Sequence, residues 1–225
     1  MIPSYPTEFF FSDKNSELKS QVADFLTSYS INPLIVYGNS GCGKTYLCKL
    51  IHKSFTDVGK NCRYISSEEL KDIVRESVLG EETYDMTEYL SEFDVVIFDD
   101  IDDIEYYTYK KRKVANVISE LVKKRVRVLV SGSIDFGELT DCREGMNKII
   151  HGHRIHFLNL EERKKYVQHR LENLHTPLDD GIIQKIAEVE KIGSINGILR
   201  FVEYTKQEQL MEIHEYVKKV TCGGQ

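Results

Sequence analysis

Several features that would classify the chain at once are absent from it. No apolar run approaches the roughly 18 residues that a membrane-spanning helix needs. The first residues, MIPSYPTEFFF, lack a basic start followed by a long apolar stretch, so we expect no secretory leader. The five cysteines are scattered and never spaced as CxxC, which is typical of reduced thiols. Together these absences predict a cytoplasmic protein.

An excess of positive charge is also missing. The chain has 30 Lys and Arg residues against 36 Asp and Glu, a formal net charge of −6. Proteins that bind duplex DNA by its phosphates carry a basic surface, so we expect weak or no autonomous DNA binding. The content of 41% hydrophobic and 29% charged residues excludes disordered and collagen-like chains.

What the sequence does contain is an alternation of short apolar runs with segments of helical period. At about 150 residues per domain, the 225 residues suit one domain with a small appendage. Apolar strands separated by helices are typical of a parallel sheet covered on both faces. We therefore predict a five-stranded α/β domain over residues 1–160. Its strands are expected at 33–38, 62–66, 94–99, 127–132 and 154–160.

The remaining residues, 161–225, contain no strand-like run. Their apolar periods predict three helices, with breaks at Thr176-Pro177 and at Gly193, where turn chemistry is expected. We therefore predict a small helical domain after the α/β domain. The three helices are expected at 161–175, 178–190 and about 195–219.

The most specific motif is GNSGCGKT, which satisfies the phosphate-binding pattern GxxxxGK[ST] between a strand-like run and a helical segment. Glycines let backbone N–H groups surround phosphate oxygens, and the helix N-terminus adds partial positive charge. Lys44 is expected to reach the β- and γ-phosphates of ATP or ADP, and the Thr45 hydroxyl to bind Mg²⁺. The predicted nucleotide-binding residues are Gly38, Asn39, Ser40, Gly41, Cys42, Gly43, Lys44, Thr45 and Tyr46.

A second motif, VVIFDDID at residues 95–102, is an apolar run that ends in acids. A strand of this kind places carboxylates at the carboxyl edge of the sheet, where the phosphate loop also lies. We expect Asp99 to hold Mg²⁺, directly or through water, and Asp100 to polarise the attacking water. Ser131, after the run RVLV, is a third polar strand end, from which a side chain can sense the γ-phosphate.

These segments together resemble the AAA+ ATPases, and within them the DnaA initiator group. NPLIVYGNSGCGKTYL is similar to the first strand and phosphate loop of that group. SSEELKDIV followed by FDVVIFDDID resembles its second strand, helix and Walker B strand. LENLHTPLDDGIIQKIAEV resembles its helical lid, and FFFSDKNSEL (9–18) is similar in position to its adenine-side loop. The resemblance implies an AAA+ base domain with a three-helix lid.

The chain also departs from that group. It ends at TCGGQ soon after the third lid helix, where initiators continue into a DNA-reading domain, and this resembles the Hda-type regulators. By the resemblance, Ile149-Ile150 stand where the family has an arginine finger, and Gly197 stands at the position of a second arginine, one turn before Arg200. A finger arginine contributes about 10³–10⁵ in rate. We therefore expect weak or partner-dependent, Mg²⁺-dependent ATP hydrolysis.

Three functions stay open on the sequence alone. The first is an ATP- or ADP-binding regulator of replication initiation that acts on other replication proteins, first among them a DnaA-type initiator. The second is a loader of the replicative helicase. The third is a small-molecule kinase with ERKKYVQHR (162–170) as a basic lid, against which the Asp99-Asp100 pair weighs. The nucleotide preference, the direction of regulation and the oligomeric state, including a homo-oligomer, are not predicted.

Overall fold

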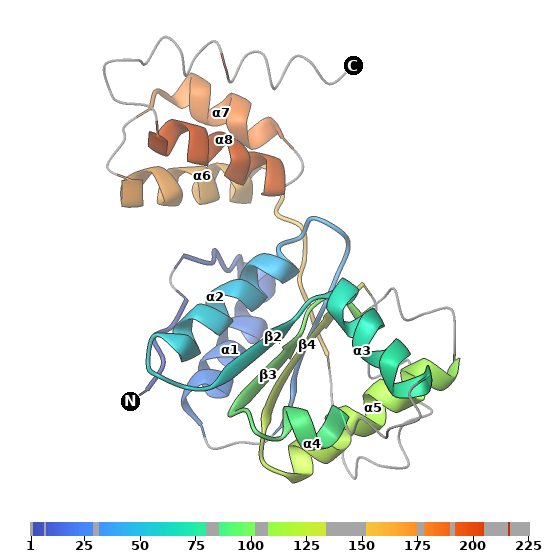
Figure 1. Cartoon of the computed structure of the whole chain (residues 1–225). Helices are drawn as coiled ribbons and strands as arrows, with labels where there is room; N and C mark the ends of the chain where they lie inside the picture. The colour runs from blue at the N-terminus through green and yellow to red at the C-terminus, as the bar shows by residue number, and fades with distance from the viewer. Residues whose placement is uncertain are drawn as a thin grey trace. The chain divides into compact units, whose positions relative to one another are not determined.

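The structure, a computed structural model, describes residues 2–6, 8–28, 32–79, 86–101, 108–133, 152–174, 178–189, 192–204 and 216 (Figure 1). The chain divides into two compact units. One contains residues 1–40 and 44–156, and the other contains residues 157–225 and 41–43. The predicted boundary between 160 and 161 lies close to this division and stays a prediction.

The first unit is built on a five-stranded parallel sheet. Its strands are β1 (Leu34–Tyr37), β2 (Cys62–Ile65), β3 (Val95–Phe98), β4 (Arg127–Gly132) and β5 (His153–Arg154). Their order across the sheet is β2-β3-β4-β1-β5, and every pair of neighbours runs parallel. The predicted five-stranded parallel sheet is therefore confirmed. In this order β4 lies between β1 and β3. The residues that follow β1 and those that follow β3 therefore lie on either side of the end of β4.

The last strand is shorter than the sequence indicated. The apolar run 154–160 predicted a strand to Leu160, whereas β5 contains only His153 and Arg154. β5 pairs with β1 alone, and the final bond runs from the Ile155 N–H to the Tyr37 carbonyl, at 2.7 Å. β1 ends at Tyr37, so the residues after Ile155 have no strand beside them to pair with.

Among the residues that the structure describes in this unit, five α-helices cover the sheet. They are α1 (Ser16–Thr27, after a short 3₁₀ turn, Asp13–Asn15), α2 (Lys44–Thr56), α3 (Ser67–Leu79), α4 (Met86–Leu90) and α5 (Thr108–Lys123). Figure 1 shows α1 and α2 on one face and α3, α4 and α5 on the other. Buried strand residues such as Val96, Phe98 and Val130 pack against the α3–α5 face. Because side chains alternate along a strand, Asp99 and Ser131 lie on the α2 face.

The described residues of the second unit include three helices, the number expected from the sequence: α6 (Leu160–Leu174), α7 (Asp180–Glu188) and α8 (Ile192–Tyr204). The Asp179 carboxylate caps α7 by accepting from the Ile182 N–H at 3.0 Å. The Arg163 guanidinium joins α6 to the end of α7 by donating to the Ala187 carbonyl at 2.6 Å. α8 starts three residues before the predicted 195, and residues 205–215 of the predicted helix lie outside the described residues.

No helix within the described ranges combines the length and the apolar character that crossing a bilayer requires.

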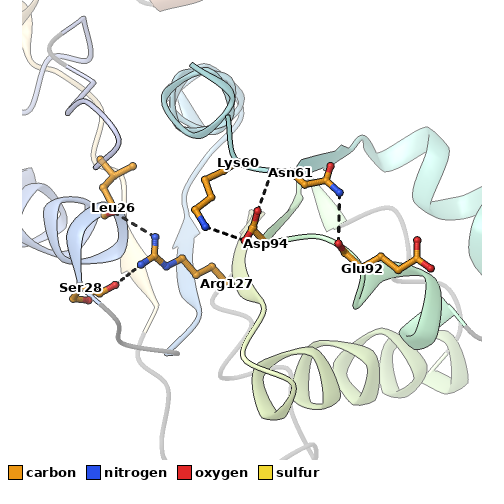
Figure 2. Close-up of polar contacts among 7 residues, drawn as sticks. All are labelled: Leu26, Ser28, Lys60, Asn61, Glu92, Asp94 and Arg127. Atoms are coloured by element: carbon orange, nitrogen blue, oxygen red, sulfur yellow. Dashed lines mark hydrogen bonds and ion pairs between the residues drawn. The ribbon is translucent and has the colours of Figure 1, made fainter. Parts of the chain in front are cut away.

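A polar network at the amino edge of the sheet joins segments that are far apart in sequence (Figure 2). Arg127 donates to the carbonyls of Leu26 and Ser28, at 3.4 and 2.5 Å, and so satisfies carbonyls at the end of α1. Asp94 accepts from Lys60 Nζ and from the Asn61 N–H, both at 3.0 Å. The Asp94 contacts thus join the start of β3 to the start of β2, and the Arg127 contacts join the start of β4 to the end of α1.

The contribution of Asp94 to the stability of the fold depends on pH. Partial burial would raise its pKa, but the bonds from Asn61 and Lys60 and the nearby Arg127 charge outweigh burial and lower the pKa below 3.8. A lowered folded-state pKa stabilises the fold above the unfolded pKa, and this contribution disappears as pH falls through the folded value. We expect Asp94→Asn to lower the free energy of unfolding at pH 7 by less than about 1 kcal/mol, since the pair is partly exposed.

Urea denaturation at pH 7 and near pH 3 checks this expectation. The difference between Asp94→Asn and the wild type should be present at pH 7 and should become smaller near pH 3, as pH falls toward the folded pKa. An equal difference at both pH values would contradict the electrostatic account. Asp57→Asn, at an exposed position just after α2, is the control and should have little effect at either pH.

Candidate functional site

The phosphate motif forms the turn between β1 and α2. Gly38 follows β1 directly, and its N–H donates to the Gly132 carbonyl at the end of β4, at 3.1 Å. Gly41 and Gly43 have φ angles of 86° and 108°, a region that side chains disfavour. The glycines at these positions are therefore required by the backbone path of the loop.

Lys44 is the first residue of α2, and it is buried, with 8% of its surface exposed. Its ammonium donates to two carbonyls of the loop itself, Gly38 at 2.7 Å and Asn39 at 3.3 Å. A cation held by neutral carbonyls gains a stronger partner when a phosphate oxygen replaces one of them. Thr45, the predicted Mg²⁺ ligand, is exposed.

The Asp99 carboxylate lies at the end of β3 and is 4% exposed. The Ser131 hydroxyl, from β4, donates to its Oδ1 at 2.5 Å. The Tyr64 hydroxyl, from β2, donates to its Oδ2 at 2.5 Å. Two strands that flank β3 on either side thus each supply a hydroxyl to the same carboxylate.

Asp100 leaves the strand by a sharp turn. It has a φ of 60°, which is rare for a residue other than glycine, and its N–H donates to the Ser131 hydroxyl at 2.9 Å. Ser131 therefore accepts from one acidic residue and donates to the other. Because Ser131 is 0% exposed, its hydroxyl fixes the backbone of Asp100 and the side chain of Asp99 together.

Cys48 lies one turn after Lys44 on α2, beside Asp99 and Ser131. Burial raises the pKa of its thiol well above the ordinary value, and the negative charge of Asp99 raises it further. Burial and the hydrogen bond to Asp99 likewise raise the pKa of Tyr64. Both groups therefore stay protonated and neutral next to the carboxylate.

The structure brings some of the predicted residues together. Asp99 and Ser131 are in direct contact, and Cys48 lies near enough to Asp99 and Lys44 that the first charge raises and the second lowers the pKa of its thiol. Tyr46 lies on the α2 turn that follows the loop, where its hydroxyl donates to Glu8 at 3.5 Å. Ile149-Ile150 lie outside the described residues, whereas Gly197 and Arg200 are exposed on α8.

Two residues of the site, Tyr64 and Cys48, were not predicted from the sequence. Tyr64 belongs to the strand-like run 62–66, and Cys48 to the helix after the phosphate loop, so both were assigned only to structural elements. The available signal for Tyr64 was a side-chain hydroxyl near the end of the predicted strand 62–66. Using it required the order of the strands, which the sequence does not contain.

A parallel sheet of order β2-β3-β4-β1-β5, with a phosphate loop after β1 and an acidic pair after β3, defines the site of an AAA+ P-loop protein. The family model for the bacterial DnaA ATPase domain matches residues 8–151. The chain belongs to this family, and its predicted resemblance to the DnaA group of AAA+ ATPases is confirmed.

Individual relatives agree with the family. The DnaA initiator of Jannaschia sp. is 23% identical over 234 residues, which cover 94% of this chain and 48% of that protein. The DnaA of Bacteroides fragilis is 24% identical over 240 residues, 97% of this chain and 49% of that protein. The chain thus spans about half the length of the curated relatives it matches.

Solved structures show the same fold. Domain III of the Thermotoga maritima DnaA matches all of this chain and 93% of that structure, with a TM-score of 0.73 and 19% identity. The AMPPCP-bound DnaA of Aquifex aeolicus matches 94% of this chain and 68% of that structure, with a TM-score of 0.71 and 15% identity.

The position of Ser131 leads to a stability prediction. Ser131→Ala removes a donor to the buried Asp99 carboxylate and the acceptor of the Asp100 N–H. We expect the free energy of unfolding to fall by about 1–3 kcal/mol, the usual penalty for buried polar groups that lose a partner.

Ser54→Ala is the matched control for this change. Ser54 is also a buried serine, but its hydroxyl only bonds back to the Leu50 carbonyl in its own helix, at 2.9 Å, so its loss should change stability by less than about 0.5 kcal/mol. Equal effects of the two substitutions in urea denaturation would show that Ser131 has no special role.

Proposed function

We propose that the protein binds ATP or ADP at the carboxyl edge of its sheet. The observation that carries this proposal is the burial of Lys44 against the carbonyls of its own loop, on the same side of the sheet as the carboxylate of Asp99. Supporting it, the DnaA of Aquifex aeolicus, which has the same fold, is bound to AMPPCP. Backbone N–H groups of residues 39–45 would hold the phosphates, with Lys44 at the β- and γ-phosphates.

The residues around Asp99 also fit a magnesium ion. Hard cations prefer oxygen ligands, and Asp99 and Thr45 offer a carboxylate and a hydroxyl for this purpose. When bound, Mg²⁺ would neutralise charge on the β- and γ-phosphates. In this arrangement Asp99 orients the metal's ligands through its carboxylate, and Ser131 keeps that carboxylate in place.

Hydrolysis by the isolated chain is proposed to be slow. We expect Asp100 to polarise a water, because Asp100 is exposed and follows Asp99 directly, and its backbone N–H is bonded to Ser131. By the resemblance to the DnaA group, Ile149-Ile150 and Gly197 stand where that group has arginines. A missing arginine leaves negative charge on the transition state unstabilised, so a partner would have to supply it.

In the cell, we propose that the protein regulates replication initiation by contact with other replication proteins, with a DnaA-type initiator as the first candidate. Membership of the DnaA ATPase family supports a role in replication and favours an ATPase site over a small-molecule kinase. The net charge of −6 supports a protein partner over duplex DNA. The replicative helicase is the alternative partner.

Isothermal calorimetry with ATP and ADP tests nucleotide binding. Lys44→Ala should weaken binding by about 10- to 100-fold, because a charge-assisted hydrogen bond to phosphate is lost. Lys49→Ala, an exposed lysine on the same helix, is the control and should bind like the wild type. If the wild type binds neither nucleotide, the proposed function is wrong.

A second experiment addresses hydrolysis and the partner. We expect the ATP turnover of the isolated chain to rise by about 10³-fold or more when the partner that donates an arginine is added. A DnaA-type initiator and a replicative helicase are added separately, and pull-downs report binding. Stimulation by the helicase alone would favour the loader. Fast turnover without either protein, or Lys44-dependent phosphate transfer to a small metabolite, would overturn the regulator.

A further inference from the structure

The two hydroxyls that donate to Asp99 differ in how firmly they are held. Ser131 is fully buried, and its oxygen also accepts from the Asp100 N–H, so moving it would break two bonds at once. Tyr64 is half-buried and lies on β2, at the edge of the sheet. Its hydroxyl is therefore the donor that can exchange with solvent at lower cost.

The sheet register explains how Tyr64 reaches the carboxylate. Tyr64 lies opposite Ile97, two residues before Asp99, so both side chains project from the same face. A diagonal neighbour at this separation is within reach of an aromatic side chain. The ring also makes an edge contact with His52 of α2, with ring centroids 5.9 Å apart, so the ring is held independently of its hydroxyl.

We propose that the Tyr64 hydroxyl donates to the same Asp99 oxygen that would accept from water bound to Mg²⁺ when nucleotide binds. By competing for this acceptor, Tyr64 sets the Mg²⁺ concentration required for binding. This inference rests on the proposed nucleotide site. Tyr64 is a positioning residue, because it acts through Asp99 and has no contact with the nucleotide assigned to it.

The physical reason is competition for one acceptor. A buried carboxylate oxygen without a donor costs free energy, so in the metal-free protein the Tyr64 bond stabilises Asp99. A metal-bound water supplies a stronger donor to the same oxygen, and the Tyr64 hydroxyl then bonds to solvent. The free energy of the Tyr64–Asp99 bond is thus subtracted from the binding free energy of the metal. Ser131, in contrast, donates to the Asp99 carboxylate both without and with the metal.

Tyr64→Phe tests the proposal, because it removes the hydroxyl and keeps the ring and its contact with His52. Nucleotide affinity is measured by calorimetry across a Mg²⁺ titration. The Mg²⁺ concentration at the midpoint should fall about three- to tenfold, and binding in EDTA should not change. Tyr89→Phe, a tyrosine on α4 that packs against Phe93 and the core, is the control and should keep the wild-type midpoint.

Thermal unfolding supplies a second readout, because the Tm without ligand reports the Tyr64–Asp99 bond in the metal-free protein. Tyr64→Phe should lower Tm without ligand, and this difference should shrink when Mg²⁺ and nucleotide are saturating. A purely structural tyrosine would lose the same stability in both conditions. Tyr64→Leu, which lacks both ring and hydroxyl, is a second variant that should shift the Mg²⁺ midpoint in the same direction if Tyr64→Phe fails to fold.

Other outcomes overturn the inference. An unchanged midpoint would mean that Tyr64 only packs, and a raised midpoint would mean that it prepares Asp99 for the metal. Wild-type nucleotide binding that is independent of Mg²⁺ would overturn it as well. Failure of the wild type to bind nucleotide is a different result, because it contradicts the proposed function itself.

Discussion

A carboxylate removed from water must receive its hydrogen bonds from the chain around it, and this requirement governs the end of β3. Asp99 accepts one hydrogen bond from the hydroxyl of Tyr64 on β2 and one from the hydroxyl of Ser131 on β4. Both bonds exist only if β3 lies between those strands in the observed register. The order of the sheet and the chemistry of its edge are therefore a single constraint.

β4, which supplies the Ser131 hydroxyl to Asp99, also holds the start of the phosphate loop. Ser131 bonds to the acidic pair, and the next residue, Gly132, accepts from the Gly38 N–H at the start of the loop. A shift of β4 would disturb both at once. At the opposite edge of the sheet, Arg127 holds β4 to the end of α1, which restrains that strand from its other end (Figure 2). Rigid support of this kind is what a site built from several strands needs.

Local sequence patterns predicted the parts of this arrangement that depend on a few neighbouring residues. The glycine spacing identified the loop and Lys44, and an apolar run followed by acids identified Asp99. The strand-end position of Ser131 identified it as a polar residue that can sense the γ-phosphate, but its hydrogen bond to Asp99 was not predicted. These inferences needed no knowledge of which strand lies beside which.

The contacts that were not predicted depend on strand order or on pairing partners. Tyr64 donates to Asp99 because β2 neighbours β3 in the sheet, and a sequence gives chain order, not spatial order. The run 154–160 was predicted as a full strand because its composition suits one, but β1 is too short to pair with it beyond Ile155. Leu26 and Arg127 are 101 positions apart in the sequence, so no local pattern indicated their contact at the amino edge.

The central claim is that the loop and the acidic strand end form one nucleotide site. A crystal structure with Mg²⁺ and a non-hydrolysable ATP analogue tests it most directly. The account predicts that the Lys44 ammonium moves from the Gly38 carbonyl to phosphate oxygens, and that Asp99 keeps its bond to Ser131. A nucleotide bound elsewhere, with Lys44 still on its own loop, would contradict the account.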